Sequence, residues 1–305
     1  KNLRLVCQIR PTNYNGSFSC SDPMLTKIWY TGAYTVKLNL LKDYYGAILM
    51  NRGDRISWTG DAYPAQAASM VAFGNYDLVR KNILHTADQS NGIRSYALYW
   101  VLSLLDYYNY TGDRATLESY INNATAKLDD AYSVYGTNPS LVFFGWDERL
   151  GSGFEHPNIP EPQNAYKMVS IRVWKEFAKA MGTIGRHDLS NKYESYARNK
   201  IKELEGSSFI SSYGLHAAAD AVNTGYLSEK DKALLYTTSF ADRTNRISYS
   251  PFNQYFVIQA LARMNKYDEA LESVSDLWGG QIEYGGTTFF ETYRPSWNTI
   301  SGKNG

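Results

Sequence analysis

The stretch "SDPMLTKIWYTGAYTVKLNLLKDYY", residues 21–45, carries the pattern that decides the fold. Ser21 is a residue type that caps helices, and Pro23 fits a first helical turn, where a missing backbone N–H costs nothing. The following apolar or small residues recur at helical spacing on one face: Leu25, Ile28, Trp29 and Gly32. The stretch therefore predicts an amphipathic helix with a defined start.

The same kind of pattern continues along most of the chain. It predicts further helices near residues 62–73, 77–89, 94–110, 113–135, 164–181, 188–205, 214–223, 228–237, 251–264 and 267–278. Asp113 is the candidate cap of the helix that is expected to run to about Tyr135. Helices paired by short turns indicate an all-α fold of stacked hairpins. Their number alone does not distinguish a closed α/α toroid from an open solenoid.

The two ends of the chain differ from this pattern. Residues 1–20 alternate loosely and predict short strands or an extended lead-in, and the Gly-rich stretch after residue 278 is typical of a strand. We therefore expect an extended lead-in over 1–20 and one helical domain over 21–305. Cys7 and Cys20 fit either a single disulfide or two buried thiols.

The composition is that of an ordinary globular protein, with 305 residues, 44% hydrophobic and 20% charged. The net charge of +1 gives no general electrostatic reason to expect nucleic acid or an acidic membrane as partner. The 26 tyrosines and 7 tryptophans suit helix packing, and they also suit the apolar faces of sugars.

The sequence lacks the motifs of several chemistries. The four histidines (His85, His156, His187 and His216) are scattered, so no protein-built metal site is expected. No Gly-rich phosphate loop and no G-x-S-x-G elbow occurs, so no nucleotide cofactor or serine nucleophile is expected. What remains is carboxylates flanked by aromatic residues. That is the equipment of glycosidic bond hydrolysis, which needs one acid and a second carboxylate.

"NRGDRISWTGDAYPAQ", residues 51–66, contains the first two candidate carboxylates. Asp54 stands beside Arg55 on a predicted loop, where such a pair is usually only solvated. Asp61 precedes an apolar helix and is suited to cap it. Trp58 between them fits either a core position or a platform for a sugar ring. The residues alone leave both readings open.

"GGTTFFETY", residues 285–293, contains the third candidate. Strict alternation would place Glu291 between Phe289 and Tyr293 on one face of a strand. A glutamate on an edge strand facing water is the alternative.

"GWDER", residues 145–149, lies in a connection over 138–163 that has no helical period. A connection of that length inside a compact domain is usually functional or disordered, and its aromatic and charged residues argue against disorder. Trp146 and Asp147 therefore either contact a substrate or belong to a surface charge cluster.

Three segments together resemble the α-L-rhamnosidases of glycoside hydrolase family 78. They are "SFSCSDPMLTKIW" (17–29), "GDRISWTGDA" (53–62) and "WGGQIEYGGTTFFE" (278–291), and "YYNYTGDRATL" (107–117) between them is similar as well. The resemblance covers essentially the whole chain. It implies an (α/α)6 toroid flanked by β-sandwich domains, inversion at the anomeric carbon and usually no metal. Because the chain ends shortly after Glu291, we expect the last toroid helix and the flanking sandwiches to be missing.

The resemblance also implies residue roles. Asp54 matches the general acid, and Glu291, after Gly286, Thr287 and Thr288, matches the general base. Asp61 matches an acid that contacts the sugar. The expected substrate-binding residues are Arg55, Trp58, Asp61, Trp146, Asp147 and Tyr293. Gly53 and Leu49 depart from the family pattern at two positions that help to hold the sugar, so the identity of the sugar stays open.

The expected function is that of an inverting exo-glycoside hydrolase acting on a terminal α-L-rhamnosyl or related residue. A toroid polysaccharide lyase or unsaturated-uronyl hydrolase, and a non-catalytic carbohydrate-binding relative, are the alternatives. The expected partner is a carbohydrate, without nucleic acid, membrane or cofactor, and the expected location is extracellular or periplasmic. In an inverting enzyme the carboxyl groups of Asp54 and Glu291 would lie about 6.5–9.5 Å apart.

Overall fold

The computed structural model describes most of the chain, and the following account concerns residues 2–4, 6, 10–46, 56–139, 142–147, 149, 159–205 and 209–300. Every regular element in these residues is helical. A single antiparallel bridge joins Leu40 and Tyr45 there. The predicted all-α class is confirmed.

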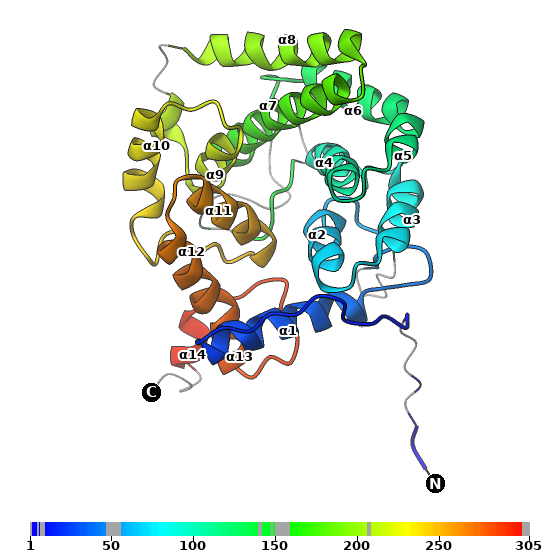
Figure 1. The fold of residues 1–305 in the computed structure, drawn as a ribbon. Coiled ribbons are helices and arrows are strands. Elements are labelled where there is room, and N and C mark those ends of the chain that lie inside the picture. The colour runs from blue at the N-terminus through cyan, green and yellow to red at the C-terminus, as the bar shows by residue number, and fades with distance from the viewer. Residues whose placement is uncertain are drawn as a thin grey trace.

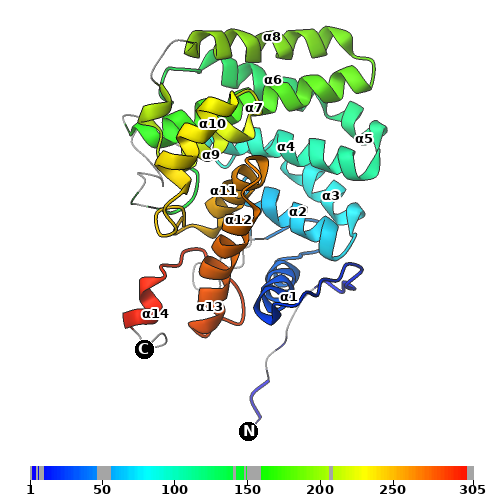
Figure 2. The same ribbon diagram turned by 60° about the vertical axis from the view of Figure 1, so that its left-hand side comes forward.

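Five helices form an inner layer in which each packs against the next along the chain (Figure 1). They are α2 (Ala62–Ala72), α4 (Arg94–Thr111), α7 (Pro160–Thr183), α9 (Leu215–Asn223) and α11 (Pro251–Arg263). A second layer lies outside them, as the turned view in Figure 2 also shows. It contains α3 (Tyr76–Thr86), α5 (Arg114–Ser119), α6 (Ile121–Ser133), α8 (His187–Leu204), α10 (Glu229–Leu235) and α12 (Tyr267–Val274).

Helix α1 (Pro23–Leu38) closes the ring. It packs against α2 on one side and against a π-helical turn, Ser275–Gly279, on the other. That turn continues α12 into α13 (Gly280–Glu283), and α14 (Ser296–Ile300) follows. Another π-helical turn, Tyr236–Phe240, extends α10, and a short 3₁₀ turn spans Phe209–Ser212. The closed arrangement confirms the toroid over the open solenoid.

The sequence explains why these layers form. Helix α4 is apolar nearly all round and buries residues such as Leu98, Trp100 and Leu102, as expected of a helix enclosed by others. Helix α8 buries only Tyr193 and Ala197 and turns its charged face outward. The indole of Trp100 donates to the carbonyl of Ile83 at 3.1 Å, so the buried ring keeps its hydrogen bond.

Two predicted helix boundaries need correction. Asp22 rather than Ser21 caps α1, because its carboxylate accepts from the amides of Met24 (2.7 Å) and Leu25 (3.3 Å). Asp113 caps α5 as predicted, but the helix does not continue to Tyr135. It ends at Ser119, the ring of the following Tyr120 packs edge-on against Trp100, and α6 starts at Ile121.

Neither end of the described chain forms a strand. Residues 10–20 are extended and attach to the end of α2, where the amides of Asn15 and Gly16 both donate to the Ala72 carbonyl. The predicted C-terminal strand is wrong as well. Residues 286–295 follow an irregular path, because the Phe289 amide donates to the Thr35 hydroxyl (3.0 Å) instead of to a neighbouring strand.

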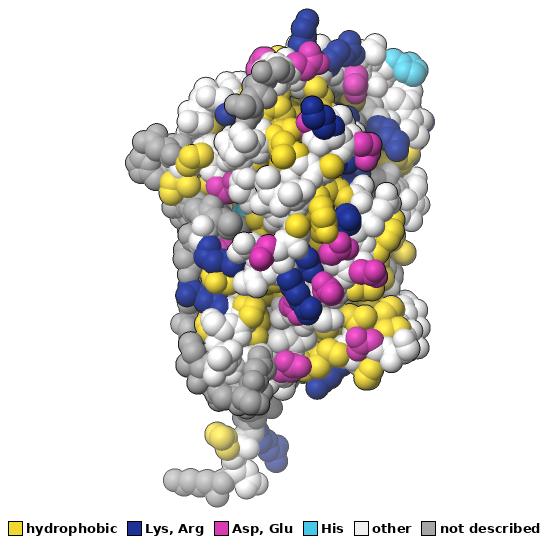
Figure 3. Space-filling model, turned by 90° about the vertical axis from the view of Figure 1, so that its left-hand side faces the viewer, with side chains coloured by type: hydrophobic (Ala, Val, Ile, Leu, Met, Phe, Trp, Pro, Cys, Tyr) yellow, Lys and Arg dark blue, Asp and Glu magenta, His cyan; other side chains and the backbone are white. Residues whose placement is uncertain are grey.

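The surface carries charges of both signs, interspersed over the face shown in Figure 3, in keeping with the net charge of +1. Cys20 is exposed and forms no disulfide with any described residue, so it is not a buried thiol, and Cys7 lies outside the described residues. Within the described part of the chain, no helix combines the length and the apolar character needed to cross a membrane.

Candidate active site

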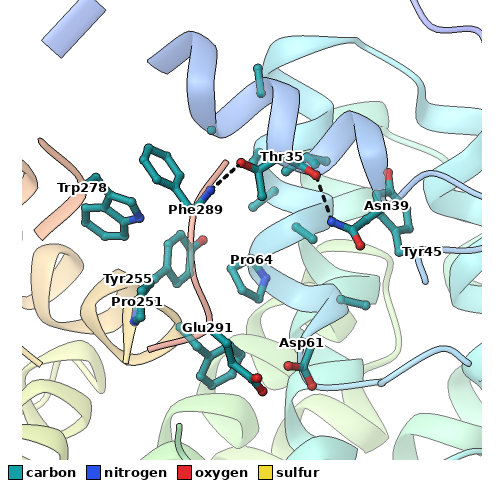
Figure 4. Close-up of a pocket in the computed structure, with 18 of the residues that line it drawn as sticks. Thr35, Asn39, Tyr45, Asp61, Pro64, Pro251, Tyr255, Trp278, Phe289 and Glu291 are labelled. Atoms are coloured by element: carbon teal, nitrogen blue, oxygen red, sulfur yellow. Dashed lines mark hydrogen bonds between the residues drawn. The ribbon is translucent and has the colours of Figure 1, made fainter. Parts of the chain in front are cut away.

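A pocket of about 820 Å³ opens between α1, α2, α11 and residues 289–291. Its volume lies within the usual range for ligand sites. Figure 4 shows Asp61 and Glu291 together at one end, whereas Trp278 and Phe289 lie at the other. The carboxylate end also contains Trp58 and Trp146. The pocket thus joins two acids, two tryptophans and a larger apolar chamber.

Asp61 stands at the N-terminus of α2 but does not cap it, because no amide of the helix donates to its side chain. Its carboxylate instead accepts a hydrogen bond from the Tyr96 hydroxyl of α4 at 2.7 Å. The predicted capping role is therefore wrong. The phenol reaches across from the neighbouring inner helix and holds the carboxylate in the pocket.

Gly60 makes this approach possible. A Cβ at Gly60 would lie 2.2 Å from the Tyr96 ring, which no side chain tolerates. Trp58 packs edge-on against the same ring at 6.5 Å between centroids. The Asn91 side chain donates to the carbonyl before Trp58 (3.1 Å) and accepts from the amide after it (2.9 Å). The segment before α2 is thereby fixed against the loop that contains Asn91 and against α4.

Glu291 receives a hydrogen bond from the Trp146 indole, whose Nε1 lies 3.0 Å from Glu291 Oε1. The backbone just before Trp146 is held by Ser95 at the start of α4. The Ser95 hydroxyl donates to the Phe143 carbonyl (2.7 Å) and accepts from the Phe143 amide (3.2 Å). Residues 145 positions apart in the chain are thus brought together at the pocket wall.

Burial raises the pKa of Asp61 to about 6. The hydrogen bond from Tyr96 lowers the pKa of Asp61, and the nearby charge of Glu291 raises it. Water in the pocket reaches this carboxylate although protein encloses its other sides. A carboxyl group with such a pKa holds a proton in mildly acidic solution and has a path by which to transfer it.

The sequence-predicted residues fall into three groups. Trp58, Asp61, Trp146 and Glu291 line one pocket. Asp54 and Arg55 lie outside the described residues, as do Leu49 and Gly53, so the predicted separation of Asp54 and Glu291 stays a prediction.

Asp147 and Tyr293 form the third group and differ from expectation. Both are 0% exposed, and neither lines the pocket. Asp147 accepts hydrogen bonds from the amide of Tyr249 (2.7 Å) and the hydroxyl of Ser248 (3.1 Å). Tyr293 packs edge-on against Trp297 at 5.8 Å between centroids. Both side chains contact protein here, where direct contact with a ligand had been expected.

Sequence reasoning did not identify several residues that line the pocket or hold its side chains. Tyr96 lies within an apolar run, and nothing in that run marks it as the partner of Asp61. Tyr255 and Trp278 line the apolar chamber and look like ordinary helix core residues in the sequence. Trp29 lies on the apolar face of residues 21–45 and lines the chamber. That apolar face was the one feature of the sequence that indicated residues of the chamber.

Comparison with known proteins places the fold. No protein-family model and no curated protein matches the chain. Among solved structures, a family GH78 rhamnosidase of Bacillus sp. GL1 matches with a TM-score of 0.76 at 16% identity, over 93% of this chain and 33% of that one. A rhamnosidase from Klebsiella oxytoca with rhamnose bound matches with a TM-score of 0.77 at 18% identity, over 93% and 60%.

An α-L-rhamnosidase from Dictyoglumus thermophilum matches with a TM-score of 0.75 at 16% identity, over 93% of this chain and 36% of that one. The chain therefore spans about one third to three fifths of the length of these proteins. The likeness shows that the chain shares the helical toroid found in them.

Proposed function

We propose that the protein is a glycoside hydrolase that removes a terminal α-L-rhamnosyl or closely related residue with inversion. The observation that carries the proposal is the convergence of Asp61 and Glu291 with Trp58 and Trp146 in one pocket. The shared fold with rhamnosidases, one of them described with rhamnose bound, supports the choice of sugar class.

The chemistry assigns different tasks to the carboxylates. An inverting hydrolase needs a base that activates water on one side of the anomeric carbon and an acid that protonates the leaving oxygen on the other. Glu291 at the pocket end is the proposed base, and the Trp146 N–H holds its carboxylate in place. Asp54 is the proposed acid, from the resemblance of its segment to the family.

Asp61 is the proposed sugar contact, and its pKa of about 6 makes it the alternative acid. The two tryptophans supply flat apolar surface for the C–H faces of the sugar ring. The neighbouring chamber, lined by Trp278 and Phe289, extends the site beyond the carboxylates (Figure 4).

The first experiment measures turnover of a panel of aryl glycosides and follows the product by proton NMR. We expect release of the aryl group from the α-L-rhamnoside or a related glycoside, with the β-anomer of the sugar formed first. An unsaturated product that absorbs in the ultraviolet would replace the proposal with a lyase. Saturable sugar binding without turnover would replace it with a carbohydrate-binding protein.

A second experiment identifies the acid. An aryl group that leaves readily, such as dinitrophenolate, needs no protonation, whereas a poor leaving group does. If Asp54 is the acid, Asp54→Asn loses turnover of the poor substrate by roughly 10²–10⁴-fold and keeps most turnover of the activated one. Asp61→Asn should then slow both substrates alike. The reverse pattern would transfer the acid role to Asp61.

We also propose that the enzyme works outside the cytoplasm, because family members that degrade polysaccharides are often exported. Cell fractionation of the source organism tests this point, and recovery of all activity in the cytosol would contradict it.

A further inference from the structure

Three chain segments meet beside the carboxylate end of the pocket: residues 145–147 with Arg149, residues 247–250 and residues 289–294. The Tyr249 peptide group joins them. Its amide donates to Asp147 at 2.7 Å, and its carbonyl accepts from the Tyr293 amide at 2.9 Å. The first contact links residues 102 positions apart. One residue of the middle segment is thus bonded to both of the others.

The Tyr249 side chain makes a second connection between the same segments. The guanidinium of Arg149 lies over its ring at 3.5 Å from the centroid, and that of Arg294 lies over it at 5.1 Å. Cation–π contacts of this kind contribute attraction without requiring a charged partner. Arg149 also donates to the carbonyl of Ile247. We refer to Asp147, Arg149, Tyr249 and Arg294 as the clasp.

Asp147 is the most enclosed member of the clasp. A buried carboxylate is costly unless donors surround it. Asp147 accepts from Arg149 through both Nε and Nη2 (3.2 Å each), in addition to the Tyr249 amide and the Ser248 hydroxyl. This set of donors fixes the position of the backbone on which Trp146 stands.

The residue on the other side of Trp146 is also fixed. Gly145 has a φ of +103°, and a Cβ there would lie 2.3 Å from the Ser250 hydroxyl. Trp146 is therefore held between a close backbone approach and the clasp. Its indole points from this position to Glu291, which lies two residues before Tyr293. Both partners of the Trp146–Glu291 hydrogen bond are thus anchored to Tyr249.

We infer that the clasp is a positioning device that sets the Trp146 indole against Glu291. Asp147 and Tyr249 act through Trp146 and do not touch substrate. The catalytic consequence rests on the proposed function, in which Glu291 is the base. The geometric consequence is independent of the proposed function. If the clasp is loosened, residues 142–147 and 289–294 should both become more mobile.

A double-mutant cycle tests the catalytic consequence. We expect Asp147→Asn and Tyr249→Ala each to lower kcat by roughly 10- to 100-fold, the cost of a misplaced catalytic group, with a smaller change in KM. In a Trp146→Phe background, which lacks the indole N–H, the same changes should lower kcat little further. Both variants keep the backbone hydrogen bonds of residue 249, and Tyr249→Phe also keeps the ring under Arg149 and Arg294, so it should retain most of the activity that Tyr249→Ala loses.

Asp113→Asn is the matched control. It removes a carboxylate with several hydrogen bonds from the outer layer and should leave kcat unchanged. Losses that are fully additive with Trp146→Phe, or an equal loss in Asp113→Asn, would overturn the inference.

Amide hydrogen exchange tests the geometric consequence without any substrate. In Asp147→Asn we expect exchange to accelerate roughly tenfold in both residues 142–147 and residues 289–294, the factor for losing a hydrogen bond to a charged group. Acceleration in the first segment alone would overturn the clasp. Joint acceleration in a protein that hydrolyses no glycoside would keep the clasp and reject the proposed function.

Discussion

Asp61 and Asp220 are two carboxylates of the inner ring with raised pKa values, and they lie in very different places. Asp61 faces the pocket, whereas Asp220 on α9 is 2% exposed and lies in the closed interior of the ring. Burial raises the pKa of both, to about 6 for Asp61 and about 8 for Asp220. A raised pKa therefore marks enclosure, and only access to a cavity makes such a group a candidate for chemistry.

The surroundings of Asp220 have the character of a structural network. The positive charge of Arg172 on α7 lowers the pKa of Asp220 and opposes the effect of burial. Arg172 is itself buried, forms an ion pair with Glu176 (2.8 Å) and donates to Gln259 (3.2 Å). This cluster joins inner helices to each other. We expect changes there to alter stability, and changes at the pocket to alter turnover.

The largest effect is expected at the pocket. Glu291→Gln keeps the size of the side chain and removes the base, so kcat should fall by roughly 10²–10⁴-fold. The midpoint of thermal unfolding should stay within a few degrees of that of the unchanged protein, because Glu291 is exposed. Steady-state kinetics and calorimetry on the same preparation measure both. A lower Tm with an unchanged kcat would show that Glu291 contributes to stability and not to turnover, the opposite of what we expect for a pocket residue.

Arg172→Leu should have the next largest effect, on stability alone. It removes the buried guanidinium that pairs with the half-buried Glu176 and lowers the pKa of Asp220, and because only one member of the ion pair is buried we expect a loss on the order of 1–3 kcal/mol of unfolding free energy, below the cost of breaking a fully buried pair. Urea titration measures the change, and kcat at low temperature serves as the control. A loss below about 1 kcal/mol would mean that the cluster does not stabilise the ring.

Asp220→Asn should change how stability depends on pH. The folded pKa of about 8 lies above the unfolded value of about 3.9, so the folded state binds the proton more tightly. The resulting stability is fully present below about pH 4 and is lost as pH rises through 8. Unfolding free energies at pH 5 and 8.5 should therefore differ less in the variant, by an amount on the order of a few kcal/mol. If the unfolding free energy changes equally with pH in the protein and in the variant, Asp220 does not titrate between pH 5 and 8.5.

Tyr96→Phe should have the smallest effect. It removes the hydroxyl that donates to Asp61 and lowers its pKa, so the pKa of Asp61 should rise above 6, by up to about one unit. Carbon-13 NMR of labelled aspartate carboxyl groups follows the titration directly. A fall in the pKa of Asp61 would mean that the phenol does not act through this hydrogen bond.

Periodicity in the sequence was sufficient to predict most of the fold. The spacing of apolar residues located α4 and α11 nearly to the residue. It missed features that depend on distant contacts. The alternation around Phe289 resembled a strand, but Phe289 and Phe290 both line the pocket because their segment is bonded to α1 and to the loop before α11.

The site was less accessible from sequence than the fold. The residues themselves left Asp61 open between a helix cap and a site residue, and only the family resemblance grouped it with Trp58, Trp146 and Glu291. The partner that prevents capping, Tyr96, lies 35 positions further along the chain. Asp147 meets Tyr249 102 positions away, so its burial had no local signal either. Contacts of this kind arise from tertiary packing and produce no periodic pattern in the sequence.

Ring closure by α1 bears on how the protein is made. The amide of Phe289 donates to Thr35 across 254 positions of the chain, and both residues line the pocket. During synthesis the first helix therefore leaves the ribosome long before its partner exists, while the hairpins between them can pack as they emerge. Thr35 and the apolar face around it lack this partner until residue 289 has been synthesised. The pocket is thus a late product of folding, and a nascent chain that stalls before residue 289 would have much of the core and no complete site.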